Sequence, residues 1–385
     1  MNRMWIKSMA CLMAMAALLL WGTQESMAQL DLESEVDPPY EASEIFEAPV
    51  RLRAEDGFVD TGASRGHSGP CLSDVDGDGL RDLVVGSFDG KFRLYRNVET
   101  NQEPSYAKFE HIQAGGEDAK VWIYCCIGSS PQFHDFDGDG IDDLLSGSYD
   151  PGEVYWFRGL GEGLFEARQT IVDREGKPVL RHPDQKQNYQ SFGSWISMVD
   201  WENDGDLDLL LGGFHGEMFV RVNEGTRREP AYSVDNTPIL IDGQPIKVPK
   251  GHAAIDVADW NNDGLWDIVS GSDNGGVYWF ENVGTPEVAS FTGPHELLPP
   301  HQGDGYREII EVGVAPRPGI RSQIDVVDYN LDGKLDLLVG DFCTTRTLRP
   351  DLTDAERDEF TKLHTEQREA IQYMVDRVDK LWKEF

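Results

Sequence analysis

A short acidic loop recurs five times along this 385-residue chain, and its side chains carry oxygen atoms of the kind that bind hard metal ions. The first copy reads Asp74-Val-Asp-Gly-Asp-Gly-Leu-Arg-Asp82, and the others begin at Asp135, Asp200, Asp259 and Asp328. Successive starts lie 61, 65, 59 and 69 residues apart. One copy alone would be compatible with an ordinary Asp-Gly turn. Five copies at near-constant spacing indicate a repeat fold and a metal together.

Calcium is the metal that this loop favours. Ca2+ takes about six to eight oxygen ligands, among which flexible carboxylates are prominent. Side chains at loop positions 1, 3, 5 and 9 can converge on one ion, the backbone carbonyl of position 7 can complete the set, and glycine at position 6 permits the turn. We therefore expect up to five structural Ca2+ ions. The expected side-chain ligands are Asp74, Asp76, Asp78, Asp82, Asp135, Asp137, Asp139, Asp143, Asp200, Glu202, Asp204, Asp208, Asp259, Asn261, Asp263, Asp267, Asp328, Asn330, Asp332 and Asp336.

Three loops depart from aspartate at position 3. Asn261 and Asn330 keep an oxygen ligand but remove a charge, and Glu202 has a longer side chain that makes the third site the least regular. No loop is an EF-hand, because an EF-hand needs a bidentate Glu at position 12. The residues at that position are Val85, Ser146, Leu211, Ser270 and Val339.

The sequence around each loop predicts β-strands. Each loop is followed by a short apolar run ending in glycine, such as 83–86, and then by a segment rich in aromatic and β-branched residues, such as 92–97. Another candidate strand precedes each loop, for example 196–199. Weaker segments open on Phe46, Phe109, Phe165, Tyr232 and Phe291. Units of about four strands and roughly 60 residues predict an all-β fold, a β-propeller of four-stranded blades.

These motifs resemble the FG-GAP and VCBS repeats, whose blades are similar to those of the integrin α-subunit N-terminal propeller. The shared pattern is D-x-D-G-D-G-x-x-D-L-x-x-G, and the resemblance covers about residues 45 to 342. Integrin-type repeats tend to continue Gly-Ala-Pro, whereas Gly86-Ser87 and Gly212-Gly213 stand here, which is more typical of the bacterial VCBS branch. The resemblance implies a calcium-binding propeller over residues 45–345, with five repeats visible and room for more in a longer chain.

The N-terminus has the features of a secretory signal peptide over residues 1–28. Arg3 and Lys7 precede an apolar run over 9–21, and Ser26-Met-Ala28 offers a small-x-small cleavage site. The run is short for a membrane span, which takes about 20 apolar residues; an uncleaved anchor is the alternative. After cleavage we expect a flexible acidic lead-in over 29–44, no stable membrane span, and a chain that is secreted, periplasmic or at the cell surface.

The C-terminus has a different pattern. Thr353-Asp-Ala-Glu356 is a capping box, and apolar residues then recur at helical spacing, which predicts an amphipathic helix over 350–385. We expect this helix to pack on the propeller or on a partner helix. The fifth unit stops at Asp341-Phe-Cys-Thr without its third strand, so the helix is either an insertion or a truncated end. If five blades close the ring, the segment opening at Phe46 is expected to complete the last blade.

The composition limits the classes of partner. Asp and Glu total 69 against 34 Lys and Arg, a formal net charge of −35, which excludes nucleic acid because phosphates would be repelled. Carboxylates crowded in the loops repel one another without metal, so calcium binding is expected to be coupled to folding. Four cysteines follow the signal segment: Cys71, Cys125, Cys126 and Cys343. A Cys71–Cys343 disulfide would join the first and last units, and free buried thiols are an equal alternative.

A second set of residues lies at the start of the predicted inner strands. Seven residues before each loop stand His67, Gly128, Gly193, His252 and Arg321. In a propeller these positions surround the end of the central channel away from the acidic loops, where ligands usually bind. The plain alternative is that they are solvated polar groups. Neighbouring positions add Asp89, Asp150, Trp195, His215 and Asp273.

Two classes of function fit these residues. The first is a non-catalytic recognition module for an extracellular glycan or protein. The second is a carbohydrate-active enzyme. A glycosidase would need two carboxylates about 5–10 Å apart, drawn from Asp89, Asp150 and Asp273. A polysaccharide lyase would instead use the two histidines and the arginine of the first set against a uronate.

Overall fold

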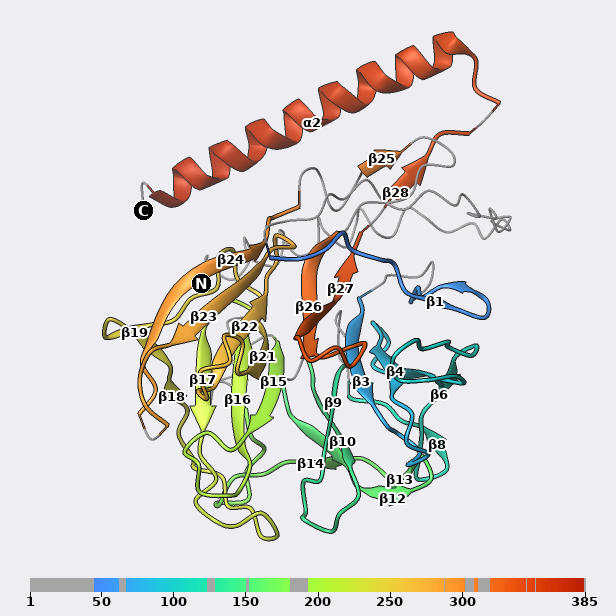
Figure 1. Cartoon of the computed structure of the whole chain (residues 1–385). Helices are drawn as coiled ribbons and strands as arrows, with labels where there is room; N and C mark the ends of the chain where they lie inside the picture. The colour runs from blue at the N-terminus through green and yellow to red at the C-terminus, as the bar shows by residue number, and fades with distance from the viewer. Residues whose placement is uncertain are drawn as a thin grey trace. The chain divides into compact units, whose positions relative to one another are not determined.

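The computed structural model describes residues 45–61, 67–122, 129–149, 152–180, 193–286, 288–301, 308–310, 319–343, 345–349 and 351–383 (Figure 1). The predicted signal peptide and lead-in lie outside the described residues, as do Cys125, Cys126, Gly128 and Asp150.

Four antiparallel sheets of four strands repeat along the described chain, each with three strands around an acidic loop and one outer strand after them (Figure 1). The first two sheets are β3 (Gly69–Ser73), β4 (Asp82–Gly86), β5 (Phe92–Tyr95), β6 (Glu110–His111) and β9 (Ser130–His134), β10 (Asp143–Gly147), β11 (Tyr155–Phe157), β14 (Gln169–Thr170). The next two are β15 (Ser194–Val199), β16 (Asp208–Gly213), β17 (Met218–Arg221), β18 (Thr237–Pro238) and β21 (Ala254–Ala258), β22 (Asp267–Gly271), β23 (Val277–Asn282), β24 (Phe291–Leu298). These are the four-stranded blades that the sequence predicts.

Shorter strands lie between the sheets. In one linking sheet β13 runs parallel to β7; among the other short pairs, β25 runs parallel to β28. The bounds are β7 (Gln113–Ala114), β8 (Glu117–Asp118), β12 (Gly159–Gly161), β13 (Leu164–Phe165), β19 (Leu240–Ile241), β20 (Gln244–Pro245), β25 (Glu308–Ile310) and β28 (Thr345–Thr347).

The fifth unit has two strands in the described part of the chain, β26 (Ile320–Val327) and β27 (Asp336–Phe342). Within the described residues no third strand pairs with β27, which agrees with the sequence prediction. Residues 45–61 do not complete this sheet: they hold a separate hairpin of β1 (Arg53–Ala54) and β2 (Gly57–Phe58). Phe46 instead packs on Trp260 with ring centroids 5.9 Å apart, in an apolar cluster of the fourth and fifth units. The expected completion of the last blade by this segment is thus replaced by side-chain packing.

The apolar runs after the loops form the second strands, which are buried along their length in the first four units. Each run ends in glycine because the backbone of the neighbouring unit leaves no room for a side chain. A Cβ on Gly147 would overlap the carbonyl oxygen of Ser194, and one on Gly340 would overlap that of Ser68. The pattern L-x-x-G therefore records how closely successive units pack.

The core consists of apolar clusters between successive units. Val84 and Phe92 of the first sheet pack with Leu144 of the second, and Leu83 of the first packs with Leu338 of the fifth. The inner strands β3, β9, β15, β21 and β26 contact one another in that order, and β26 contacts β3 again. Cys71 in β3 is buried with a free thiol, so the Cys71–Cys343 disulfide is not formed.

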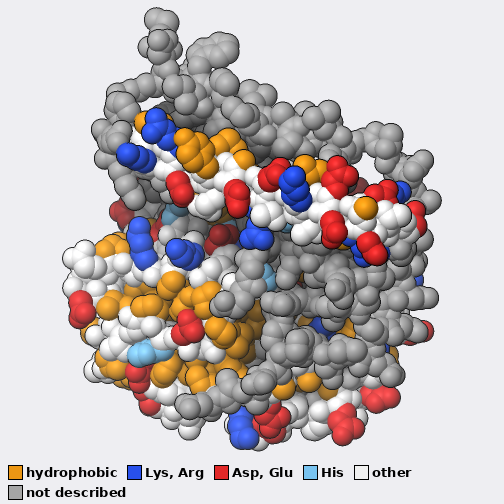
Figure 2. All heavy atoms as spheres, turned by 90° about the horizontal axis from the view of Figure 1, so that it is seen from above, with side chains coloured by type: hydrophobic (Ala, Val, Ile, Leu, Met, Phe, Trp, Pro, Cys, Tyr) orange, Lys and Arg blue, Asp and Glu red, His pale blue; other side chains and the backbone are white. Residues whose placement is uncertain are grey.

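Helix α2 (Asp354–Lys383) confirms the predicted C-terminal helix. Its capping box is formed: Thr353 N donates to Glu356 Oε2 at 2.8 Å, and Glu356 N donates to Thr353 Oγ1 at 3.3 Å. Acidic, basic and apolar side chains all lie along the surface of this helix (Figure 2). The exposed apolar side chains of α2 are Phe360, Leu363, Tyr373, Met374, Val375, Val378 and Leu381. In the described residues, no helix is long and apolar enough to cross a membrane.

Candidate metal loops and entry cluster

The carboxylates at loop positions 1, 3 and 5 come together in the first two units. Ligand oxygens of Asp74, Asp76 and Asp78 all lie within 4.8 Å of one another. Asp74 also accepts hydrogen bonds from the backbone N–H groups of Gly77 at 2.8 Å and Gly79 at 2.9 Å, so the loop wraps around its first side chain. The matching cluster in the second unit is Asp135, Asp137 and Asp139.

Position 9 plays a second part in the second, third and fourth units. Both carboxylate oxygens of Asp208 accept backbone hydrogen bonds, from Trp201 N at 2.9 Å and from Asn223 N at 2.8 Å. The side chain thus ties loop position 2 to the third strand. Burial, as the largest cause, raises the pKa of Asp82, Asp143 and Asp208 to about 6. Position 9 belongs to neither three-carboxylate cluster, and its role as a ligand stays a prediction.

Three buried loop oxygens have no hydrogen-bond partner: Asp82 Oδ2, Asp135 Oδ1 and Asp206 Oδ1. Asp206, at position 7, is 6 % exposed. Burial, followed by the charges of Asp204 and Asp200, raises its pKa to about 6. The sequence analysis assigned only the backbone carbonyl to position 7 and missed this carboxylate. An unpaired buried carboxylate oxygen is costly, and an oxygen-only donor set fits Ca2+.

Arginines hold the loops to neighbouring units through backbone carbonyls. Arg81 donates to the carbonyl oxygens of Asp328 at 2.8 Å and Tyr329 at 3.0 Å. Arg227 donates to Asp135 O at 2.9 Å from Nη2. Arg227 Nη2 also lies 3.6 Å from Asp135 Oδ2, so it pairs with the loop carboxylate as well.

At the opposite ends of the inner strands, five residues form what we call the entry cluster: His67, Trp195, His252, Asp273 and Arg321. Arg321 Nε donates to Asp273 Oδ1 at 3.1 Å, and Arg321 Nη1 lies 3.3 Å from His67 Nε2. His252 Nε2 lies 3.8 Å from Asp273 Oδ1, and the His252 ring centroid lies 4.6 Å from that of Trp195. The structure therefore brings together four residues of the predicted ligand face.

Aromatic rings surround the two histidines. His67 stacks between Phe88, at 5.7 Å, and Phe342, at 4.7 Å between ring centroids. His252 contacts Phe214 at 4.7 Å, and Phe214 in turn contacts His215 at 5.3 Å. His215, the fifth predicted residue, is exposed at the edge of this aromatic group.

Both histidines of the entry cluster are neutral at pH 7. Burial, and then the charge of Arg321, lowers the pKa of His67 to about 3, and the same two causes lower the pKa of His252 well below its ordinary value. Because a guanidinium can only donate, His67 Nε2 must accept, and its proton lies on Nδ1. His67 Nδ1 is buried and has no hydrogen-bond partner.

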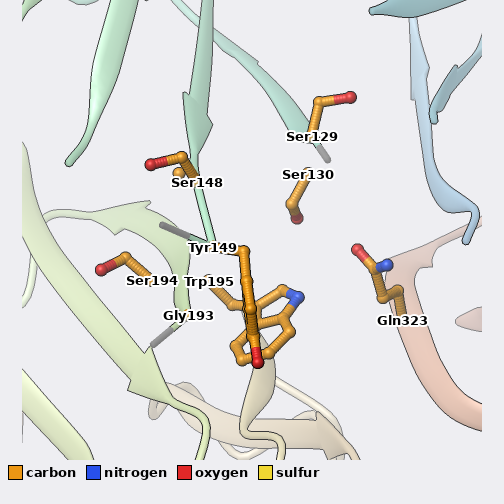
Figure 3. A pocket seen from close by; sticks show the side chains of 9 residues that line it. Ser129, Ser130, Ser148, Tyr149, Gly193, Ser194, Trp195 and Gln323 are labelled. Carbon is orange, nitrogen blue, oxygen red and sulfur yellow. The ribbon is translucent and has the colours of Figure 1, made fainter. Parts of the chain in front are cut away.

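Backbone strain marks the same positions. His252 and Arg321 have φ of 57° and 58°, where Gly193 at the equivalent position has 79°. The left-handed region is unfavourable for a bulky residue, and such strain concentrates at functional sites. A cavity of about 10 Å³, the size of one water molecule, lies beside the cluster (Figure 3). Trp195, Ser130 and Gln323 are among its lining residues, and Gln323 Oε1 is buried without a partner.

The comparison with protein families agrees with this repeat architecture. A family model described as FG-GAP-like repeat matches residues 135–211 and 259–339. Each match begins at an acidic loop and ends in the second strand of the following unit. This chain carries FG-GAP-like repeats. The model matches begin at Asp135 and Asp259, the first residues of two acidic loops.

Two curated relatives each match part of this chain. BBSome complex member BBS2 from Homo sapiens is 25% identical over 167 residues, 38% of this chain and 20% of BBS2. Integrin alpha pat-2 from Caenorhabditis elegans is 23% identical over 171 residues, 40% of this chain and 13% of the integrin. The chain therefore spans a fifth or less of either relative.

Solved structures similar to this chain include two propeller-like neighbours. A lectin from Agrocybe aegerita, described as recognising non-reducing terminal N-acetylglucosamine, is 18% identical with a TM-score of 0.36, covering 71% of this chain and 61% of the lectin. BBS1N in complex with ARL6DN is 18% identical with a TM-score of 0.28, covering 59% of this chain and 60% of that chain.

Two of the three carboxylates weighed for a glycosidase, Asp89 and Asp273, are not poised as an acid–base pair, and Asp150 lies outside the described residues. Asp273 is engaged by Arg321. Asp89 accepts hydrogen bonds from Ser87 Oγ at 2.6 Å and Lys91 N at 3.2 Å. Burial alone would raise the pKa of Asp89, but these hydrogen bonds outweigh it and lower that pKa. A general acid needs a raised pKa, so Asp89 is better suited to holding its own turn.

Proposed function

We propose that this chain is an exported, calcium-stabilised recognition module that binds a glycan or protein ligand at its entry cluster. The observation that carries the proposal is the buried, unpaired N–H of His67 beside Arg321. A buried donor without a partner costs about 1–3 kcal/mol, and an acceptor supplied by a ligand would recover that cost. Strain at Arg321 and His252 supports the same site, because it aims two polar side chains at one place.

We propose that calcium stabilises the acidic loops, which follow the ends of the inner strands away from the entry cluster. The side chains at positions 1, 3, 5 and 9 would hold it, together with Asp206 in the third loop. Bound calcium would neutralise carboxylates that otherwise repel one another. At free calcium 100-fold above the dissociation constant, each site would add about 2.7 kcal/mol to the free energy of unfolding. Calcium concentrations outside cells favour occupancy even of weak sites.

The calcium role is tested by thermal unfolding of the mature protein. We expect Tm to rise in steps as calcium is added to chelator-treated protein. A Tm that is the same in calcium and in chelator would contradict the metal role. Export is tested by expressing the full chain and locating it: retention in the cytoplasm with residues 1–28 intact would contradict the signal peptide.

The ligand role is tested by binding of the calcium-loaded protein to a panel of immobilised polysaccharides and extracellular proteins. His67→Ala and Arg321→Gly should each weaken binding at least about tenfold, which corresponds to roughly 1.4 kcal/mol. Glycine is chosen at position 321 because it tolerates the backbone φ of 58° found there. His295→Ala, on outer strand β24, is the matched control and should change nothing. New reducing ends, or unsaturated products absorbing in the ultraviolet, would overturn the non-catalytic role.

A further inference from the structure

One position at the end of the third strand has the same register in four units, and its charge differs from unit to unit. The residue after it donates its backbone N–H to the position-9 carboxylate, as Gly159 does to Asp143 at 2.6 Å and Asn282 to Asp267 at 2.6 Å. Asn97 and Asn223 make the same bond to Asp82 and Asp208. This shared bond aligns the four units with one another at the end of the third strand. We call the residue that precedes the donor of this bond the flank position. The four flank residues are Arg96, Arg158, Val222 and Glu281.

In the first two units the flank residue is a cation seated on the loop carboxylates. Arg158 Nε lies 2.6 Å from Asp137 Oδ2, and Arg158 Nη2 lies 2.5 Å from Asp139 Oδ2. Arg96 makes the equivalent ion pair with Asp76. Position 3 in both loops, and position 5 in the second loop, would be used by calcium and are already paired with a built-in positive charge.

In the third and fourth units no positive charge occupies this position. Val222 is uncharged, and the third loop contains the extra buried carboxylate of Asp206. Glu281 Oε1 lies 3.3 Å from the Nδ2 atom of Asn261, the position-3 residue of the fourth loop. Glu281 therefore returns to the fourth loop the negative charge that Asn261 removes.

We propose that the flank position sets the calcium affinity of each loop: Arg96 and Arg158 are cations that calcium must displace, and Glu281 supplies a further carboxylate to the fourth loop. This inference rests on the proposed calcium role. Displacing an arginine costs its two ion pairs and leaves a guanidinium near a divalent ion, which repels it. The third and fourth loops consequently fill at lower calcium than the first and second.

The inference is tested by calorimetric calcium titration of the full mature protein. Wild type should show stronger and weaker classes of site. Arg158→Met should tighten one weaker site about tenfold, since a unit charge a few ångströms from Ca2+ is worth roughly that factor. Glu281→Gln should weaken one stronger site by a similar factor. Arg168→Met is the charge-matched control, because Arg168 is exposed over the Tyr155 ring and away from the loop carboxylates, and it should leave both classes unchanged.

A second measurement guards against a folding defect and reports on the loops that contain tryptophan. Terbium binds calcium sites and is sensitised by nearby tryptophan; the third loop contains Trp201 and the fourth contains Trp260 and Trp266. Glu281→Gln should raise the terbium concentration needed for half-maximal luminescence, while Arg158→Met should not. In chelator, Arg158→Met should lower Tm, because the arginine then offsets carboxylate repulsion.

The outcomes separate this inference from the calcium role on which it rests. Calcium binding by wild type that Arg158→Met and Glu281→Gln leave unchanged would overturn the flank inference alone. Absence of calcium binding by wild type and by every variant would overturn the calcium role, and the flank inference with it.

Discussion

The Oδ2 atom of Asp325 accepts a hydrogen bond from the backbone N–H of Leu72 at 2.9 Å, although 253 residues separate the two in the chain. This bond joins the inner strand of the fifth unit to that of the first. The fourth and fifth units are joined in the same way, since Asp256 Oδ2 accepts from Val326 N at 2.8 Å. In both of these units the side chain three residues before the loop thus reaches the backbone of the neighbouring unit.

The first prediction concerns the bond from Asp325 to Leu72. Asp325→Ala should lower the free energy of unfolding by about 1–3 kcal/mol, because a buried N–H is left unpaired. Asp325→Asn keeps an acceptor oxygen, and it removes a group whose pKa burial and the charge of Asp256 raise well above the ordinary value. Asp325→Asn should therefore be at least as stable as wild type at pH 8. Urea unfolding in saturating calcium measures both, and an Asp325→Ala variant as stable as wild type would show that the bond is dispensable.

The second prediction is the pH dependence caused by Asp256. Burial raises its pKa from 3.8 to about 6. The folded state holds this proton more tightly than the unfolded chain does. The protonated carboxyl therefore contributes to the free energy of unfolding fully below about pH 4, and this contribution is lost as pH rises through about 6. Asp256 and Asp325 titrate as a pair, with the Ser197 hydroxyl 3.3 Å from Asp256 Oδ1. Asp256→Asn should gain about 1–3 kcal/mol relative to wild type between pH 4 and pH 7.5.

Urea midpoints of wild type and Asp256→Asn across this range, in saturating calcium, check the prediction. Asp242→Asn, in an exposed turn, is the control and should stay parallel to wild type. A constant difference between wild type and Asp256→Asn at all pH values would mean that Asp256 stays ionised in the folded protein.

The sequence predicted what local pattern can encode. The loop beginning at Asp74, the buried run after Asp82 and the capping box at Thr353 each depend on residues a few positions apart, and the structure contains all three. Aligning the units by their loops also placed His67, His252 and Arg321 at equivalent positions, and the structure brings them together around Asp273.

Contacts between units were not predictable in the same way. Nothing near Asp325 in the sequence identifies Leu72 as its partner, and nothing near Phe46 shows that it packs on Trp260 rather than completing the fifth sheet. Such contacts depend on how closely successive units approach. The glycines indicate that the approach is close, but they do not identify which residues meet. Asp206 was missed because position 7 usually contributes its carbonyl, and only burial showed its side chain to be unpaired.

The third prediction separates the two roles of position 9. Asp208→Ala leaves the backbone N–H groups of Trp201 and Asn223 unpaired, so it should cost about 2–5 kcal/mol. That loss should persist in chelator, because neither bond needs a metal. Asp208→Asn keeps one acceptor and should cost less in chelator. Urea unfolding with and without calcium measures both variants, and a loss confined to calcium would assign Asp208 to metal binding alone.

The fourth prediction is a stabilising substitution at loop position 4. The backbone is left-handed there in all five loops: φ is 78° at Gly77, 70° at Gly138, 57° at Asn203 and 59° at Asn262. The fifth loop places Leu331 there with φ of 58°, and its side chain is 46% exposed, so it gains little from burial.

Leucine in this conformation costs roughly 1–2 kcal/mol that asparagine largely avoids. Leu331→Asn should therefore raise the free energy of unfolding by about 1 kcal/mol, both in calcium and in chelator, because the gain comes from the backbone rather than from the metal. Lys334→Asn, an exposed position of the same loop without positive φ, is the matched control for loop composition. Urea midpoints measure both variants. If Leu331→Asn is no more stable than wild type while Lys334→Asn is neutral, Leu331 contributes a contact that outweighs its backbone strain.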